Sequence, residues 1–279
     1  MIVVTGATGN VGSALVRMLA EAGEQVTAVS RRAAADLPEG VRQVTADLTD
    51  VQSLAPALEG AKQLYLLFAQ GSFEADVPGI LAAAAEAGVG RVVLQSSQGV
   101  ATRPESASHG QLGKAVEVAV QESGLEWTIL RPGGFQSNMF AWAEQVRSER
   151  TVAAPFGDVG IPFVDPEDIA AMAAAALRED GHAGRIYTLT GPVAETPRDR
   201  VRVLSEILGD TVQFLEQTPE EAQEQMLKFM PPAVVDTTLA ILGHPTEDEV
   251  RVSPDVEQVL RRAPRPFAAW AERNIAAFR

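Results

Sequence analysis

Cysteine is absent from the 279-residue chain, and histidine, tyrosine and lysine are scarce, with three, two and three residues respectively. The absence of cysteine excludes disulfide bonds, thiolate nucleophiles and cysteine-based metal sites. The histidines His109, His182 and His244 do not have the spacing of a metal site, so we predict no metal ligands. No apolar run approaches the roughly 20 residues of a membrane span, so we expect no membrane association.

Basic residues are fewer than acidic residues in this chain. The chain carries 23 Lys and Arg residues against 37 Asp and Glu residues, a formal net charge of −14 at pH 7, and it has no basic cluster. Nucleic-acid binding requires a positive face, so we expect no nucleic-acid partner. The first apolar stretch starts at Ile2 and leaves no room for a charged leader, which predicts a cytoplasmic location.

The N-terminal stretch MIVVTGATGNVG, residues 1–12, organises the rest of the chain. A branched apolar run leads into three glycines spaced three residues apart, and an amphipathic helical pattern follows until Gly23. This order is typical of a dinucleotide-binding site, where the pyrophosphate lies at the start of the helix. A purely structural turn is the alternative. The predicted phosphate contacts are Gly6, Thr8, Gly9, Asn10, Val11 and Gly12.

The cofactor type is predicted from the end of the second expected strand, residues 25–32. Dinucleotide sites that select NAD have an acidic residue here, whereas this chain has Ser30, Arg31 and Arg32. Two guanidinium groups and a hydroxyl favour the 2′-phosphate of NADP. We therefore predict NADP(H) as the preferred cofactor and NAD(H) as the second choice. A solvated basic pair is the alternative.

Strand and helix patterns alternate up to residue 142 and predict an α/β fold, with a doubly wound parallel sheet of the NAD(P)-binding Rossmann type. We expect residues 1–150 to form the dinucleotide-binding core, residues 165–191 to return to it, and residues 192–279 to form a smaller, mainly helical substrate lobe. Residues 102–110 are expected to be a surface loop. Further strands are predicted at 41–46, 63–68, 91–95, 128–130 and 185–190, and helices at 51–58, 78–87, 114–122 and 165–177.

The carboxyl ends of such strands form the ligand-binding edge of the sheet. Asp47 is predicted to accept a hydrogen bond from the adenine amino group while Leu48 packs on the ring. Asp50 is expected to cap the next helix. Further residues predicted at the cofactor are Phe68, Ala69, Gln70, Ser96, Lys114, Pro132, Gly133 and Phe135.

Seven segments, TGATGNVG, SRR, ADL, SS, TILRPGGFQSN, PFVDPEDIA and GRIYTLTGP, occur in this order between Met1 and about Gly209. With them the chain resembles the NmrA-like group of atypical short-chain dehydrogenases. This group includes NAD(P)H-dependent quinone reductases, triphenylmethane-dye reductases, aromatic polyketide reductases and catalytically silent cofactor sensors. The resemblance therefore implies the fold and leaves the activity open.

Typical short-chain dehydrogenases use Ser, Tyr and Lys, with the tyrosine four residues before the lysine. Neither Tyr65 nor Tyr187 has a lysine at this spacing, and the position four residues before Lys114 is Gly110. The resemblance implies that Lys114 keeps the role of the lysine and holds the nicotinamide ribose.

Four other side chains are candidates for roles beside Lys114. The resemblance implies Ser97 as the catalytic serine, with Ser96 as the other choice. Glu117 lies one helical turn after Lys114 and is expected to orient it, unless the two form an ordinary surface ion pair. His109 is a catalytic candidate because it titrates near neutral pH, and a solvated loop histidine is the alternative.

The missing tyrosine limits the chemistry. Reduction of an unactivated ketone generates a strongly basic alkoxide that needs a proton donor. A quinone gives an aromatic hydroquinone anion of much lower basicity, for which positioning and a hydrogen-bond donor suffice. Aromatic walls with few polar groups suit such flat rings. The predicted substrate contacts are Phe68, Gln70, Gln98, Phe135, Asn138, Met139, Trp142 and Phe163.

We therefore predict an NADPH-dependent oxidoreductase that reduces a quinone or a related polycyclic aromatic small molecule. Such an enzyme fits aromatic polyketide tailoring, and because hydroquinones react with oxygen it also fits a monooxygenase system that couples reduction to hydroxylation. The alternative is a catalytically silent NADP-sensing regulator that binds a protein partner. The sequence is compatible with a monomer and with a homodimer.

Overall fold

The computed structural model describes residues 1–34, 36–68 and 74–279. They divide into two compact units, each made of three segments of chain. The first unit comprises Met1–Ser97, Leu112–Pro132 and Pro166–Thr188. The second unit comprises Gln98–Gln111, Gly133–Asp165 and Leu189–Arg279, so two of its segments come before residue 192.

The first unit is built around a seven-stranded sheet with the strand order β3-β2-β1-β4-β5-β6-β8. All neighbours from β3 to β6 pair in parallel, as predicted for a doubly wound sheet. The strand order reverses between β1 and β4, so the ends of these strands form the topological switch point where such sheets bind ligands. The strands are β1 (Ile2–Thr5), β2 (Val26–Ser30), β3 (Arg42–Thr45), β4 (Gln63–Leu67), β5 (Arg91–Gln95), β6 (Glu126–Pro132) and β8 (Arg185–Leu189).

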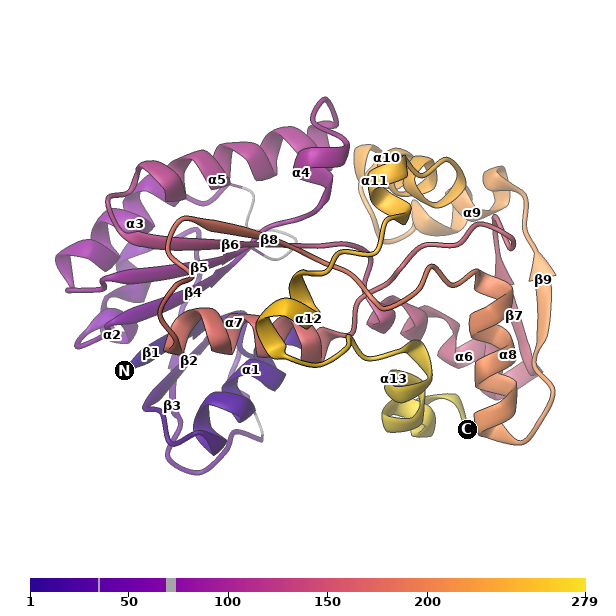
Figure 1. Ribbon diagram of the computed structural model, residues 1–279, viewed down its shortest axis with the longest axis horizontal. Helices are drawn as coiled ribbons and strands as arrows, with labels where there is room; N and C mark the ends of the chain where they lie inside the picture. Colours follow the sequence, from indigo (N-terminus) through magenta and orange to yellow (C-terminus); the bar gives the residue numbers. More distant parts are fainter. Residues whose placement is uncertain (35, 69–73) are drawn as a thin grey trace. The chain divides into compact units, whose positions relative to one another are not determined.

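Helices cover both faces of this sheet. Figure 1 shows α1 and α7 on one face and α3 and α5 on the other, and each pair of helices is also in contact. Residues such as Val3, Leu64 and Ile129 are almost completely buried between the sheet and its helices. The helical elements are α1 (Asn10–Glu21), the 3-10 helix η1 (Val51–Leu54), α2 (Ala55–Leu58), α3 (Val77–Glu86), α5 (Leu112–Glu122) and α7 (Pro166–Arg178).

The second unit is mainly helical and has its own core, which includes Trp142, Leu204, Phe267 and Trp270. Three of its helices begin with a threonine whose side chain caps the first turn, at Thr196, Thr218 and Thr246. Its elements are α4 (Gly99–Thr102), the π-helix η2 (Ala107–Gln111), the 3-10 helix η3 (Gln136–Trp142), α6 (Ala143–Glu149), β7 (Thr151–Ala154), α8 (Pro197–Leu208), β9 (Gln213–Glu216), α9 (Pro219–Met226), α10 (Pro232–Gly243), α11 (Glu247–Val250), α12 (Asp255–Leu260), α13 (Phe267–Asn274) and the 3-10 helix η4 (Ile275–Phe278).

The structure differs from the sequence prediction in two places. Residues 102–110 are not a loop throughout, because α4 ends at Thr102 and the π-helix η2 starts at Ala107 and leads directly into α5. The C-terminal part also contains a strand, since β9 pairs in parallel with β7 in a separate two-stranded sheet. Four-residue strands with partly exposed side chains have little apolar periodicity, which explains why β9 was not predicted.

Candidate functional site: a dinucleotide turn and an apolar cavity

The glycine turn joins β1 to α1, and its three glycines have different constraints. Gly6 has φ +64°, which favours glycine. A Cβ atom on Gly12 would lie 2.1 Å from the carbonyl oxygen of Gly6, so only glycine fits between helix and turn. A Cβ atom on Gly9 would meet the same oxygen at 3.3 Å and nothing else within 4 Å. Gly9 is therefore free on its outer side, which a phosphate group can approach.

The start of α1 is open to an anion. Gly9 is the N-cap residue and supplies no side-chain cap, and Thr8, Gly9 and Asn10 are exposed. The N–H groups in the first turn of a helix have no intrahelical acceptors, and the helix dipole adds a partial positive charge there. The backbone N–H groups of Asn10, Val11 and Gly12 therefore suit a pyrophosphate, and this contact stays a prediction.

The predicted 2′-phosphate site follows β2. Arg31 and Arg32 are exposed, and neither forms an ion pair within the described part of the chain. Ser30 is buried, and its hydroxyl donates a 2.6 Å hydrogen bond to the carbonyl oxygen of Arg32. Because this hydroxyl has no second proton to donate, Ser30 shapes the turn that carries the two arginines, and the arginines are the groups suited to a phosphate.

The predicted adenine contacts follow β3. The Oδ1 atom of Asp47 accepts hydrogen bonds from the backbone N–H and the hydroxyl of Thr49, at 3.0 and 2.9 Å. These bonds, together with the positive charge of Arg31, lower the pKa of Asp47. Leu48 is buried in the core of the unit, so packing on an adenine ring would need a different side-chain position. Asp50 accepts from the N–H of Gln52 and caps η1, as expected.

The end of β4 carries further predicted contacts. Phe68 is half-buried and packs against the core of the first unit. Ala69 and Gln70 lie outside the described residues.

A buried carboxylate lies behind the ends of β5 and β6. Glu117, on α5, is 1% exposed, and it accepts hydrogen bonds from Arg131 Nε at 2.9 Å and from Ser96 Oγ at 2.6 Å. The expectation that Glu117 orients Lys114 is therefore wrong, because both carboxylate oxygens face Arg131. Arg131 is 14 residues away in sequence, so helical spacing alone does not reveal this pair.

Lys114 is exposed on the first turn of α5 and has no hydrogen bond or ion pair among the described residues. Its ammonium group is thus available to a ligand. Ser97, the first residue after Ser96 at the end of β5, is half-buried. Ser96 itself donates to Glu117, so its hydroxyl proton is already used.

Both tyrosines are engaged elsewhere. Tyr65 is completely buried in β4, which strongly raises its pKa, and its hydroxyl bonds to the side-chain oxygen of Gln95. The hydroxyl of Tyr187 lies 2.9 Å from Nδ1 of His182. Neither tyrosine therefore replaces the proton donor that the sequence lacks beside Lys114.

The second unit contains a cavity of about 560 Å³ with mostly apolar walls. Of the predicted substrate contacts, Asn138, Met139, Trp142 and Phe163 line it, and so does His109. The α9–α10 region contributes a further apolar wall that the sequence did not indicate. The residues of this wall are Ala222, Met226, Phe229, Met230, Val234 and Leu242.

Other predicted contacts serve the framework of the second unit. The side-chain amide of Gln98 donates to the carbonyl oxygen of Asp248 at 2.8 Å. Gly133 donates its N–H to the carbonyl oxygen of Leu189 at 3.0 Å, and Phe135 forms an isolated bridge with Val164. In the first unit, Pro132 ends β6 and is buried. Gln98 and Phe135 are not among the described residues that line the cavity.

His109 belongs to the π-helix η2. Its Nδ1 atom lies 2.8 Å from the hydroxyl of Ser108, which in turn donates to the carbonyl oxygen of Ala233 on α10. Burial lowers the pKa of His109, so the ring is neutral at pH 7. It is held in place, in contrast to a solvated loop histidine.

Arg200 is the site residue that sequence reasoning missed. It lies on α8, lines the cavity and is 3% exposed, and burial lowers its pKa to about 10. Its guanidinium carbon lies 4.0 Å from the centre of the Phe163 ring. A signal was present, because Arg200 lies four residues before the buried Leu204 and next to Val201 on the apolar stripe of the helix.

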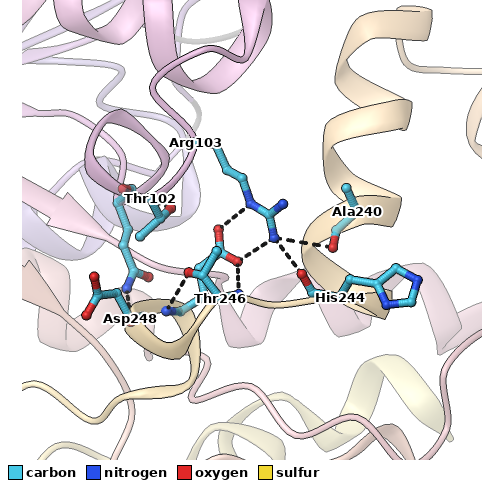
Figure 2. A network of polar contacts seen from close by, with 8 residues as sticks. Thr102, Arg103, Ala240, His244, Thr246 and Asp248 are labelled. Atoms are coloured by element: carbon cyan, nitrogen blue, oxygen red, sulfur yellow. Dashed lines mark hydrogen bonds and ion pairs between the residues drawn. The ribbon is translucent and has the colours of Figure 1, made fainter.

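A polar network centred on Arg103 holds the end of α10, and Figure 2 shows this network. Arg103 donates from Nε and Nη2 to the two carboxylate oxygens of Glu249, at 2.9 and 2.7 Å. It also donates to the carbonyl oxygens of His244 and Ala240, at 2.7 and 3.4 Å. These carbonyls lie at the C-terminal end of α10, so Arg103 anchors a helix that lines the cavity with Val234, Thr238 and Leu242.

Within the described residues, no group of three or more His, Cys, Asp or Glu side chains is arranged to hold a metal ion. In the same part of the chain, no helix has the length and apolar character needed to cross a membrane.

Comparison with known proteins identifies a family that binds NAD(P)H. Residues 6–180 match the model of a protein family described as NAD(P)H-binding. The chain is 36% identical over 286 residues to a (4-alkanoyl-5-oxo-2,5-dihydrofuran-3-yl)methyl phosphate reductase of Streptomyces griseus subsp. griseus, covering 100% of this chain and 99% of the relative. It is 32% identical over 287 residues to an NAD(P)H azoreductase of Xenophilus azovorans, with the same two coverages.

A solved structure supports the fold alone. An NADPH-dependent quinone oxidoreductase from Escherichia coli, in complex with NADPH, has a TM-score of 0.79 and 22% identity to this chain. The match covers 99% of this chain and 100% of the other.

Proposed function

We propose that the chain uses NADPH to reduce a quinone or a related electron-poor polycyclic aromatic compound. The premise is that the chain belongs to the NAD(P)H-binding family and is an NAD(P)H-dependent oxidoreductase. The observation that carries this proposal is the apolar cavity in a chain whose two tyrosines are both engaged elsewhere. A flat substrate whose reduced form is a weak base fits such a protein.

The residues of the first unit bind the cofactor in this proposal. The glycine turn and the start of α1 hold the pyrophosphate, Arg31 and Arg32 hold the 2′-phosphate, and Lys114 donates to the hydroxyls of the nicotinamide ribose. When bound, the reduced nicotinamide supplies the hydride. Lys114 thus contributes by orientation, which is worth most in the rate of the reaction.

The residues of the second unit receive the substrate. Trp142, Met139 and Phe163 provide apolar surface, and Asn138 provides a polar contact. His109 is neutral at pH 7, so it offers the substrate a hydrogen-bonding nitrogen without a charge. Protonation of the product by water completes the reaction, because an aromatic hydroquinone anion does not need an acid as strong as an alkoxide does.

The names of the relatives support a conjugated hydride acceptor as the substrate. An azo compound, a quinone and an oxo-dihydrofuran are all conjugated acceptors, and these are what the relatives are named for. Aromatic polyketide tailoring and a subsequent hydroxylation by oxygen are the finer part of the proposal. The proposal also places the protein in the cytoplasm, as a monomer or a homodimer.

The test is NADPH oxidation with a panel of naphthoquinones, anthraquinones, azo dyes and triphenylmethane dyes, with aliphatic ketones as the comparison. We expect turnover with members of the aromatic panel and none with the ketones. A protein that binds NADPH and oxidises it with no panel member would contradict the proposal. The cofactor-sensing regulator, which the missing tyrosine favours, would then take its place.

A further inference from the structure

Arg200 is the one cationic side chain among the described residues that line the cavity. It is 3% exposed, on a wall that otherwise consists largely of apolar and uncharged side chains such as Trp142, Phe156 and Phe163. Burying a charged group in such surroundings is costly unless the charge is paired. The protein thus keeps a cation at a position where an apolar residue would pack at lower cost.

The guanidinium of Arg200 has donors to spare. Nη2 donates a 2.6 Å hydrogen bond to the carbonyl oxygen of Ile161. Nε is buried without a hydrogen-bond partner, and Nη1 has none among the described residues. The face of the group is covered by the ring of Phe163 at 4.0 Å, which leaves the edge for further contacts.

No carboxylate in the described part of the chain pairs directly with this cation. None of the described residues forms an ion pair with Arg200 within 4.0 Å. Asp199, the preceding residue, uses its carboxylate to cap α8 through Thr196. The charges of Glu195 and Asp199 act on Arg200 and raise its pKa, but burial has the larger effect and lowers it.

Arg200 also has a built position. Gly134 allows the ring of Phe163 to approach, because a Cβ atom there would lie 2.6 Å from that ring. The ring supports the guanidinium, and the Ile161 carbonyl fixes its rotation. A cation that is held rigidly with an unsatisfied edge is preorganised for a ligand.

We propose that Arg200 binds an ionised oxygen group of the substrate, so that the cavity selects a flat aromatic compound that carries a carboxylate, phenolate or phosphate. A planar guanidinium matches such oxygens with charge-assisted hydrogen bonds. The proposal rests on the proposed function in taking this cavity as the substrate site. It adds that the substrate carries an anionic oxygen group, which the site distinguishes from a neutral one.

The test uses non-reducible ligands, so that binding is measured without turnover or cofactor. Naphthalene-2-carboxylate and naphthalene-2-carboxamide have the same shape and differ in charge, and 1-naphthyl phosphate and 1-naphthol form a second pair. Isothermal titration at pH 7 should show each anion binding about 10- to 100-fold more tightly than its neutral partner. The pair with the larger ratio identifies which acid the site prefers.

Three variants assign the effect to Arg200. In Arg200→Met the preference for the anion should disappear, while affinity for the carboxamide stays within about threefold. In Arg202→Met, which removes an exposed arginine from the same helix, the preference should remain. Arg200→Lys keeps the charge without the planar fork and should keep part of the preference, which provides a second test if the methionine variant does not fold.

Equal binding of anion and neutral partner by the wild-type protein would overturn the inference, as would a preserved preference in a folded Arg200→Met protein. Failure of the proposed function would look different. Anion-selective binding in a protein that reduces no member of the quinone and dye panel would uphold Arg200 as an anion site and contradict the reductase.

Discussion

Glu117 and Arg131 form a buried ion pair in which the Nε group of Arg131 donates to Oε1 of Glu117 at 2.9 Å while Nη2 donates to Oε2. Ser96 donates to the same carboxylate, so one acidic side chain on α5 holds the ends of both β5 and β6. Ser96 and Ser97 follow β5, and residues 133–165, which include several cavity-lining residues, follow β6. The pair thus supports the ligand-binding edge of the sheet.

Removing this carboxylate should destabilise the fold. Glu117→Ala leaves the charge of Arg131 and the hydroxyl of Ser96 without their partner, and we expect the free energy of unfolding to fall by about 3 to 5 kcal/mol. Urea denaturation measures this, with Glu122→Ala, an exposed position on the same helix, as the control. A loss below about 1 kcal/mol would show that water or another group replaces the carboxylate.

Arg31 and Arg32 should determine the preference for NADPH. Because both are exposed and free of ion pairs within the described chain, the double variant Arg31→Ala/Arg32→Ala should keep its fold. We expect its affinity for NADPH to fall about 10- to 100-fold, with the affinity for NADH little changed. Fluorescence titration of both cofactors checks this, and equal losses for the two would show that the arginines do not contact the 2′-phosphate.

Gly9 and Gly12 should separate cofactor binding from folding. Gly9→Val places its side chain on the outer side of the turn and should abolish NADPH binding while the thermal midpoint stays near that of the wild type. Gly12→Val forces the backbone at Gly6 to move and should lower the thermal midpoint markedly. If Gly9→Val retained full NADPH affinity, the turn would have only a structural role.

Lys114→Ala should affect the rate more than the binding. Its ammonium is exposed and unpartnered among the described residues, so its loss leaves the fold intact. We expect kcat with a polycyclic quinone to fall at least about tenfold, while NADPH affinity, which is spread over the whole dinucleotide, changes little. Lys62→Ala, at another exposed lysine of the first unit, is the control. Unchanged kcat would remove Lys114 from the site.

The lowered pKa of His109 predicts a loss of stability in mild acid. Below its ordinary value of 6.5 the unfolded chain takes up a proton that the buried ring resists, so the unfolded state binds more protons and is favoured as the pH falls. This loss should level off below the folded-state pKa. We expect the drop in unfolding free energy between pH 7.5 and pH 5 to be smaller in His109→Gln.

Two other groups contribute to the same profile. His182 also has a pKa lowered by burial, so it leaves a residual slope of the same sign in the variant. The raised pKa of Glu195 has the opposite sign, because its stabilising contribution is lost as the pH rises. The comparison of wild type with His109→Gln isolates the histidine. Parallel profiles for the two proteins would contradict the prediction.

Local sequence patterns predicted the parallel sheet and the glycine turn well. Strand, glycine turn and helix depend on neighbouring residues, so Gly6, Gly12 and the strand that starts at Ile2 are readable directly. The cap at Asp50 is equally local. Asn138, Met139 and Trp142, which were predicted as substrate contacts, follow β6 within ten residues and line the cavity.

Long-range pairing set the limit of prediction. Glu117 was assigned to Lys114 because helical spacing shows only neighbours on the same helix, whereas its partner Arg131 lies on a strand. Leu48 packs in the core of the unit, and its contact with the adenine stays a prediction. Arg200 was missed because an arginine among other arginines on a helix looks solvated until the packing of that helix is known.

The chain passes between its two units five times, after residues 97, 111, 132, 165 and 188. Neither unit is therefore one continuous segment that can be expressed alone. A fragment that stops at residue 188 keeps every segment of the first unit. In this fragment Trp142 and Phe163 lose their core neighbours, which are Leu204, Phe267 and Trp270. Transplanting this cavity onto another dinucleotide-binding protein would require three separate grafts, so changing its specificity by substitution within the intact chain is the simpler engineering route.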